Sequence, residues 1–302
     1  MITFLSGGTG TPKLIAGARH LINDDSITVI VNTAEDMWYQ GGHLSPDIDT
    51  VLYLFTGLLN QETWWGITND SFITHTSLLS LGVDAYLALG DRDRATTIAR
   101  AEYLRSGCSL TMATQAISEK MGVSATILPM SDTPVASVVD TKTGTMHFQE
   151  YWVKHKGTCA ITGVRRVSDT EPCATTEVLD ALLQADLIVI GPSNPITSIL
   201  PILSCAGVRE ALHKKPVVAI SPFIGDEPVS GPAKDLMIAS GLEPNSRGVA
   251  SLYEGIISTF IQDIIDPVDV TGSVRYDTMM KNETIAVELM QCILDHEHIS
   301  LC

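Results

Sequence analysis

The amino-acid sequence predicts an α/β fold, with a Rossmann-like parallel sheet flanked by helices and a small β-containing insertion. Short apolar runs of strand length alternate with longer segments of helical periodicity, which is typical of βαβ units and a parallel sheet. Several of these runs end in small polar residues, glycine or proline, at the edge where open α/β sheets bind ligands. The length of 302 residues is enough to bury a core without disulfides or a structural metal.

The expected strands and helices follow one another along the chain. The predicted strands are Ile2–Ser6, Ile27–Asn32, Ala125–Pro129, Leu187–Gly191 and Val217–Ser221. The predicted helices are Lys13–Leu21, Thr50–Leu59, Arg94–Ser106, Leu110–Met121, Thr176–Gln184, Ile199–Leu212 and Glu283–Asp295.

A hairpin is expected between the two halves of the chain. Val135–Asp140 and Thr145–Gln149 flank the sequence Thr-Lys-Thr-Gly, a turn that suits two antiparallel strands. We therefore predict a first part of the α/β core at 1–132, a small β-rich insertion at 133–175, and a second part of the core at 176–302.

Composition excludes several classes of protein. The formal net charge is −16, from 35 acidic and 19 basic residues, so nucleic acid is not expected as a partner. No apolar run has the length of a membrane span, and the N-terminus does not resemble a signal peptide. No membrane partner and a cytoplasmic location are therefore expected. The six cysteines form no Cys-x-x-Cys pair, which predicts neither a zinc site nor a disulfide framework.

A glycine-rich loop, Ser6-Gly-Gly-Thr-Gly-Thr-Pro-Lys13, follows the first predicted strand and opens a helix. Glycine lets the backbone approach a ligand, and the amides of a helix N-terminus can bind phosphate. The loop lacks the Gly-Lys-Ser/Thr ending of a P-loop, and Lys13 stands where a dinucleotide fingerprint has its last glycine. A tight turn is the alternative interpretation, but the position after the first strand favours a phosphate site.

An acidic loop follows the second predicted strand, between Asn32 and Thr50. It contains the four carboxylates Glu35, Asp36, Asp47 and Asp49. Capping of the next helix needs only one of them. Acids in excess beside a phosphate loop favour Mg²⁺, a hard cation that takes one or two carboxylates together with substrate oxygens. Asn32 stands where a dehydrogenase has an acid for the ribose, which disfavours that class.

Four further segments have two interpretations each. Gly90-Asp-Arg-Asp-Arg94 is either a solvated, capped helix start or an arginine clamp for an anion. Gly191-Pro-Ser-Asn-Pro195 and Ser221-Pro222 combine turn chemistry with polar groups at strand ends. Trp64 and Trp65 are either core packing or a stacking platform for a flat ring.

Taken together, these motifs resemble the 2-phospho-L-lactate transferase family of coenzyme F-420 biosynthesis. The resemblance rests on Gly7–Gly10, on Ser45-Pro-Asp-Ile-Asp-Thr50, on Gly90-Asp-Arg-Asp93 and on Gly191–Pro195, and it runs from residue 1 to about Tyr253. It implies a cytoplasmic, Mg²⁺-dependent transferase. The phospholactyl group of a guanosine diphosphate-linked lactate donor would pass to the ribityl hydroxyl of a deazaflavin alcohol acceptor, with release of GMP.

The resemblance also implies roles for residues. Asp36 and Asp49 would hold the metal, Asp49 is also a possible base, and Arg92 would neutralise developing charge. The residues expected at the substrates are Gly8, Thr9, Gly10, Lys13, Asn32, Ser45, Asp47, Thr50, Trp65, Asp91, Ser193, Asn194 and Ser221.

Two other functions stay open from the sequence. One is a sugar-nucleotide or dinucleotide-binding regulator without catalysis, because a wider superfamily shares the glycine-rich loop. The other is the disfavoured dehydrogenase. A phosphoenolpyruvate donor is equally compatible with the residues. A homodimer is the assembly expected by default for a soluble enzyme.

Overall fold

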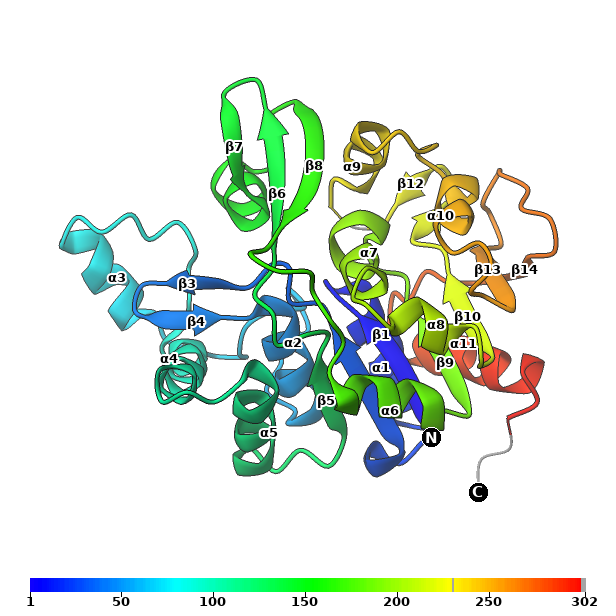
Figure 1. Cartoon of the computed structure of the whole chain (residues 1–302), viewed down its shortest axis with the longest axis horizontal. Helices are drawn as coiled ribbons and strands as arrows, with labels where there is room; N and C mark the ends of the chain where they lie inside the picture. The colour runs from blue at the N-terminus through cyan, green and yellow to red at the C-terminus, as the bar shows by residue number, and fades with distance from the viewer. Residues whose placement is uncertain (230, 300–302) are drawn as a thin grey trace.

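A seven-stranded parallel sheet forms the core of the computed structural model, which describes residues 1–229 and 231–299 (Figure 1). The strand order is β14-β13-β10-β9-β1-β2-β5, and each neighbouring pair is parallel. The strands are β1 (Ile2–Ser6), β2 (Ile27–Val31), β5 (Thr126–Pro129), β9 (Leu187–Ile190), β10 (Val217–Ile220), β13 (Thr259–Asp263) and β14 (Val274–Tyr276). The five predicted strands are confirmed within one residue at either end. The sequence analysis missed β13 and β14.

Helices cover both faces of this sheet, because neighbouring residues of each strand point to opposite sides. In β1, Leu5 packs into one core cluster and Phe4 into the other. The Leu5 face is covered by α6 (Thr176–Gln184), α7 (Leu200–Leu203), α8 (Val208–Leu212), α9 (Ala233–Ala239) and α10 (Ser246–Leu252). The Phe4 face is covered by α1 (Gly10–Ala18), α2 (Pro46–Phe55), α5 (Leu110–Lys120) and α11 (Glu283–His296). The predicted fold class is confirmed.

Several predicted helix boundaries need correction. Helix α2 begins at Pro46 rather than Thr50, because Ser45 takes the N-cap position and proline suits the first helical turn. The single helix expected at Ile199–Leu212 is wrong. The chain there forms the π-helical turn η3 (Pro195–Ile199), then α7 and α8, and Gly207 separates the last two with a left-handed φ of 90°.

The expected hairpin is present and belongs to a small antiparallel sheet. Strands β6 (Ala136–Thr141), β7 (Gly144–His147) and β8 (Ile161–Val167) pair in the order β7-β6-β8. This sheet projects from the parallel core at the top of Figure 1. The π-helical turn η2 (Glu150–Lys154) follows β7. The exact boundaries of the insertion stay a prediction.

The remaining elements are short or peripheral. They are the 3₁₀ turn η1 (Asp24–Ser26), the hairpin of β3 (Met37–Tyr39) with β4 (Gly42–Leu44), α3 (Ile73–Ser80), α4 (Asp91–Arg105), and the hairpin of β11 (Phe223–Ile224) with β12 (Glu227–Pro228). None of the helices in the described part of the chain has the length and apolar composition to cross a bilayer.

The direction of sheet growth reverses between β1 and β9. From β1 the chain adds β2 and β5 on one side, whereas β9, β10, β13 and β14 lie on the other. The loops that follow β1 and β9 therefore lead to opposite sides of this point at the carboxyl edge, which is where open α/β sheets bind ligands. The two loops are in close contact, because a Cβ on Gly10 would collide with the backbone carbonyl of Pro192. This position defines the candidate site.

Candidate active site

Ser193, in the loop after β9, holds the glycine-rich loop in place through hydrogen bonds. The Ser193 hydroxyl accepts a hydrogen bond from the Thr11 amide at 3.3 Å, lies 2.6 Å from Thr11 Oγ1 and donates to the Gly7 carbonyl. Thr9 occupies the N-cap position of α1 and makes no side-chain capping bond. The start of α1 is therefore capped by Ser193 from another loop and not by Thr9, and the positive end of its dipole lies beside the glycine-rich loop.

Asp47 ties this loop to the end of β2. Its Oδ1 accepts from the Gly8 amide at 2.8 Å, and its Oδ2 accepts from Asn32 Nδ2 at 2.8 Å. Burial raises the pKa of Asp47 to about 6, although both hydrogen bonds act in the opposite direction. The Gly8 amide, expected at a phosphate, is thus already bound within the protein. Gly8 itself has φ of +59°, a conformation that favours glycine.

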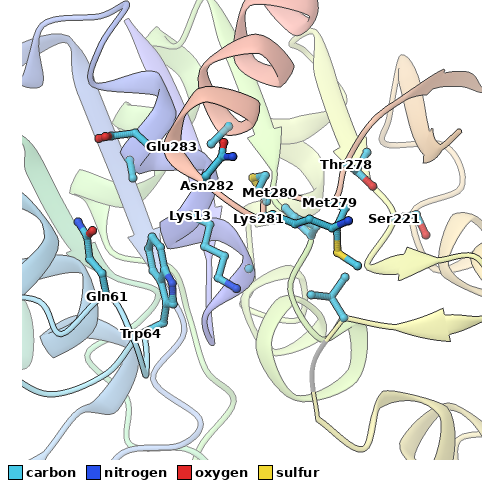
Figure 2. A pocket seen from close by; sticks show the side chains of 15 residues that line it. Lys13, Gln61, Trp64, Ser221, Thr278, Met279, Met280, Lys281, Asn282 and Glu283 are labelled. Atoms are coloured by element: carbon cyan, nitrogen blue, oxygen red, sulfur yellow. The ribbon is translucent and has the colours of Figure 1, made fainter.

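A polar cavity of about 350 Å³ lies on one side of the loop. Figure 2 shows its wall, with Lys13 between Trp64 and the segment that precedes α11. The Lys13 ammonium is 5.4 Å from the centre of the Trp64 ring, and burial lowers the pKa of Lys13. Lys281, Asn282 and the carboxylate of Glu283 also line this cavity, together with Met279 and Met280. Two cationic side chains therefore lie near the start of α1.

A second cavity, of about 220 Å³, lies on the other side of the loop and has more aromatic and apolar walls. Its tryptophans come from different parts of the chain. Trp64 and Trp65 belong to the segment after α2, and Trp152 belongs to η2 in the insertion. The other lining residues are Gly8, Thr9, Glu35, Leu44, Pro46, Asp47, Asp49, Thr50, Tyr53, Gly66, Leu87, Leu89, Asp93, Gln149 and Val153.

Buried charges support the aromatic cavity. Asp49 forms an ion pair with Arg100 of α4, whose side chain is 0% exposed and which also donates to the His43 carbonyl at 3.0 Å. Tyr53 donates to Asp93 at 2.8 Å, and burial raises the pKa of Asp93 to about 7. These contacts fix α2 against α4, so they hold two of the carboxylates that line the cavity.

The other two acids of the acidic loop point in different directions. Glu35 lines the aromatic cavity and accepts from Gln149 of the insertion at 2.6 Å; burial and the nearby Asp47 raise its pKa well above the usual range. Asp36 accepts from Ser45 at 2.7 Å and lines a separate cavity. Burial raises the pKa of Asp36 as well.

The structure does not bring Asp36 and Asp49 together as a shared metal site. They line different cavities, and both Asp49 oxygens accept from Arg100. Within residues 1–229 and 231–299, no group of three or more His, Cys, Asp or Glu side chains is arranged to enclose a metal ion. Their assignment to the metal stays a prediction that this geometry does not favour.

Most of the other predicted residues lie at the site, in two groups. The cavities are lined directly by Gly8, Thr9, Gly10, Lys13, Asp47, Thr50, Trp65 and Ser221. A second group lies behind these walls and makes hydrogen bonds within the protein. Its members are Asn32, Ser45, Ser193 and Asn194. Asn194, for example, caps η3 by accepting from the Ile196 amide at 3.0 Å.

Arg92 and Asp91 lie away from both cavities. Asp91 accepts from the amides of Ile73 and Thr74 at 3.0 and 2.9 Å, so it caps α3. The amide of Arg92 donates to Asp70, and its side chain is exposed in a separate surface groove beside α4. The segment is a helix start, as in the first interpretation, but Asp70 caps it rather than Asp91 or Asp93, and Asp93 and Arg94 are buried rather than solvated.

Arg100, Tyr53 and Gln149 were not predicted. Asp93 and Arg100 are seven residues apart, which places them on one face of a helix, and this spacing was the available signal. Gln149 had no such signal, because the sequence does not say where the insertion folds back. The contact between Gln149 and Glu35 depends on tertiary structure.

A glycine-rich loop at the sheet reversal of an α/β fold, between two unlike cavities, is typical of proteins that bind phosphorylated ligands. A sequence model of the family described as 2-phospho-L-lactate transferase CofD matches residues 2–293. The chain therefore belongs to the 2-phospho-L-lactate transferase family, and it is a transferase.

Relatives of the same name are similar over nearly their whole length. The chain is 58% identical to the 2-phospho-L-lactate transferase of Methanospirillum hungatei, with 97% of this chain and 99% of that protein aligned. The corresponding protein of Methanocorpusculum labreanum is 55% identical, over 98% and 99% of the two chains. The predicted family is confirmed.

A solved structure supports the fold alone. A UPF0052 family protein from Bacillus halodurans superposes with a TM-score of 0.59 at 19% identity, over 89% of this chain and 81% of that one.

Proposed function

We propose that this enzyme transfers 2-phospho-L-lactate from lactyl-2-diphospho-5'-guanosine to 7,8-didemethyl-8-hydroxy-5-deazariboflavin, releasing GMP, in coenzyme F-420 biosynthesis. The observation that carries this proposal is the pair of unlike cavities on either side of the glycine-rich loop. The reaction joins an anionic nucleoside diphosphate to a flat tricyclic alcohol. These two substrates need surfaces as different as the two cavities.

The polar cavity suits the donor. Lys13 and Lys281 supply positive charge, and the start of α1 adds the positive end of a helix dipole. A diphosphate placed there lies beside the glycine-rich loop, between the strand ends of β1 and β9.

The aromatic cavity suits the acceptor. Trp64, Trp65 and Trp152 offer faces on which a tricyclic ring can stack. The carboxylates of Asp47 and Asp49 lie in the same cavity and can receive hydrogen bonds from ribityl hydroxyls. With its ring in this cavity, the acceptor can direct its terminal hydroxyl towards the glycine-rich loop and the donor phosphorus.

A single displacement then completes the transfer. The ribityl oxygen forms a bond to the lactate-bearing phosphorus, the bond from this phosphorus to the GMP oxygen breaks, and the hydroxyl proton passes to a carboxylate. Asp49 is the proposed acceptor of that proton, because its pairing with Arg100 orients it in the cavity. Phosphoryl transfer needs alignment and charge neutralisation more than covalent catalysis.

Mg²⁺ is proposed as the cofactor. Buried acids outnumber buried cations here, since Glu35, Asp47, Asp49 and Asp93 lie around the aromatic cavity. Mg²⁺ commonly binds through one or two carboxylates and substrate phosphates, so an enclosing protein cage is unnecessary. Asp47 lines the cavity beside the glycine-rich loop and would hold the ion, which would neutralise charge on the diphosphate, whereas both oxygens of Asp49 accept from Arg100.

The test is a reconstituted reaction of the purified protein with both substrates and Mg²⁺. GMP and the phosphodiester are expected in equal amounts, with inversion at a chiral phosphorus and no GMP burst when the acceptor is omitted. Chelation with EDTA is expected to stop turnover, and added Mg²⁺ to restore it. Tight binding of a sugar nucleotide, without turnover of any deazaflavin, would instead support the regulator.

The proposed cytoplasmic homodimer is a separate question. Light scattering of the purified protein tests the dimer, and a monomer mass would contradict it.

A further inference from the structure

Trp64 forms part of both cavities. Among the described residues that line them, it is the residue that the polar and the aromatic cavity share. It is half-buried and packs against the core cluster on the Phe4 face of the sheet. One indole ring therefore separates the space assigned to the donor from the space assigned to the acceptor.

The backbone at Trp64 is held in an unfavourable conformation. Its φ is +58°, in the left-handed region that a bulky side chain rarely adopts. Hydrogen bonds within the loop maintain it: the Trp64 amide donates to Asn60 O at 2.8 Å, and the Asn60 amide donates to Gly66 O at 3.0 Å. Strain of this kind persists where the surrounding structure determines it, often at ligand clamps. Here it sets the direction of the indole ring.

Lys13 connects the ring to the polar cavity. It lies in the first turn of α1, directly after the glycine-rich loop, and its ammonium is 5.4 Å from the Trp64 ring centre. A cation at this distance is attracted to the face of the ring. An anion in the polar cavity competes for the same ammonium, so its binding changes the surroundings of Trp64.

We propose that Trp64 couples the two substrate sites, so that a diphosphate in the polar cavity raises the affinity of the aromatic cavity for the acceptor ring. The diphosphate draws the Lys13 ammonium away from the indole ring. An acceptor ring that stacks on Trp64 then no longer competes with this cation–π contact. Coupling of this kind is reciprocal, so the acceptor raises the affinity for the diphosphate by the same factor. The inference rests on the proposed function.

Calorimetric titration of deazaflavin alcohol, without GDP and with GDP at a saturating concentration for each variant, tests the coupling. We expect GDP to lower the acceptor Kd about fivefold in the wild type, at the lower end of typical couplings. Trp64→Leu is expected to bring the ratio close to one. Trp65→Leu is the matched control, because Trp65 lines the aromatic cavity alone; it should weaken the acceptor but keep the ratio.

Lys13→Met provides a second variant that leaves the ring in place. The ratio of its acceptor Kd without GDP to its acceptor Kd with GDP should fall below two. Equal acceptor Kd values with and without GDP in the wild type would overturn the coupling and leave the proposed function intact. A fivefold ratio that survives in both Trp64→Leu and Lys13→Met would also overturn it. Failure of the wild type to bind either ligand would overturn the proposed function as well.

Discussion

The two cavities differ in where their charges lie. The polar cavity has its cations on lysine side chains at its wall, and the Lys13 ammonium lies over the Trp64 indole ring. The aromatic cavity is supported by an ion pair that is completely buried between α2 and α4. Lysine ammonium groups can move towards an incoming phosphate, whereas the buried pair is fixed by the fold. The comparison indicates that the donor side adapts to its ligand and the acceptor side is preorganised.

Removal of the buried cation should affect the acceptor side most. Arg100→Leu leaves the Asp49 carboxylate buried without its partner, which costs about 3–5 kcal/mol in free energy of unfolding. Binding of the deazaflavin should be lost, while the surviving folded protein should still bind GDP. Urea unfolding and two separate titrations measure these effects.

Arg92→Leu is the control on the same helix. Its side chain is exposed and lies away from both cavities, so stability should change by no more than about 0.5 kcal/mol and both affinities should be kept. A large loss of turnover in Arg92→Leu would restore the role that the family resemblance implies. Equal stability of Arg100→Leu and the wild type would contradict the preorganised acceptor side.

The glycine-rich loop should respond next. Gly10→Ala places a methyl group against the Pro192 carbonyl, which forces the loops after β1 and β9 apart at a cost of about 1–3 kcal/mol. GDP affinity should fall at least tenfold. Gly8→Ala meets open space, with Ser198 Oγ at 3.5 Å, and should cost about 1 kcal/mol through its positive φ alone. If Gly8→Ala proves the more harmful to GDP binding, the diphosphate lies on the other side of the loop.

The last comparison concerns pH and the acceptor side. Burial raises the folded-state pKa of Asp93 to about 7, whereas an unfolded aspartate titrates near 4. The folded protein therefore binds more protons between these values, so Asp93 reduces stability as pH rises from about 4 to 7.

Asp93→Asn removes this dependence and keeps an acceptor for Tyr53. The stability difference between variant and wild type should grow with pH, by no more than about 1.4 kcal/mol per unit. Parallel unfolding curves at pH 5, 6 and 7 measure it. A difference that stays constant with pH would show that Asp93 is ionised throughout.

The central strands were predictable because each is a short and mostly apolar run. β1, β2 and β9 are buried along their whole length, and this leaves a direct signal in the sequence. β13 and β14 were missed for the opposite reason. The end of β13 contains Gln262 and Asp263, which are buried through hydrogen bonds to side chains in the loops that follow. Buried polar residues of this kind leave no hydrophobic periodicity in the sequence.

The candidate site divides in the same way. Gly10, Lys13 and Asp47 were predicted at the site because they lie close to strand ends, and strand ends meet at one edge of the sheet. The roles of Asp49 and Arg92 depend on which side of a helix faces which cavity. That orientation is set by the packing of α2 against α4, and these two helices are far apart in the sequence.

The contact between α1 and α11 has a consequence for synthesis. Gly17 of α1 lies so close to the Ala286 backbone that no side chain fits between the two helices, and β1 pairs with β9 about 185 residues later. A growing chain therefore exposes its glycine-rich loop long before the strand and helix that support it have left the ribosome. β1 can pair early with β2, but the glycine-rich loop completes its native contacts only after β9 and α11 have been made.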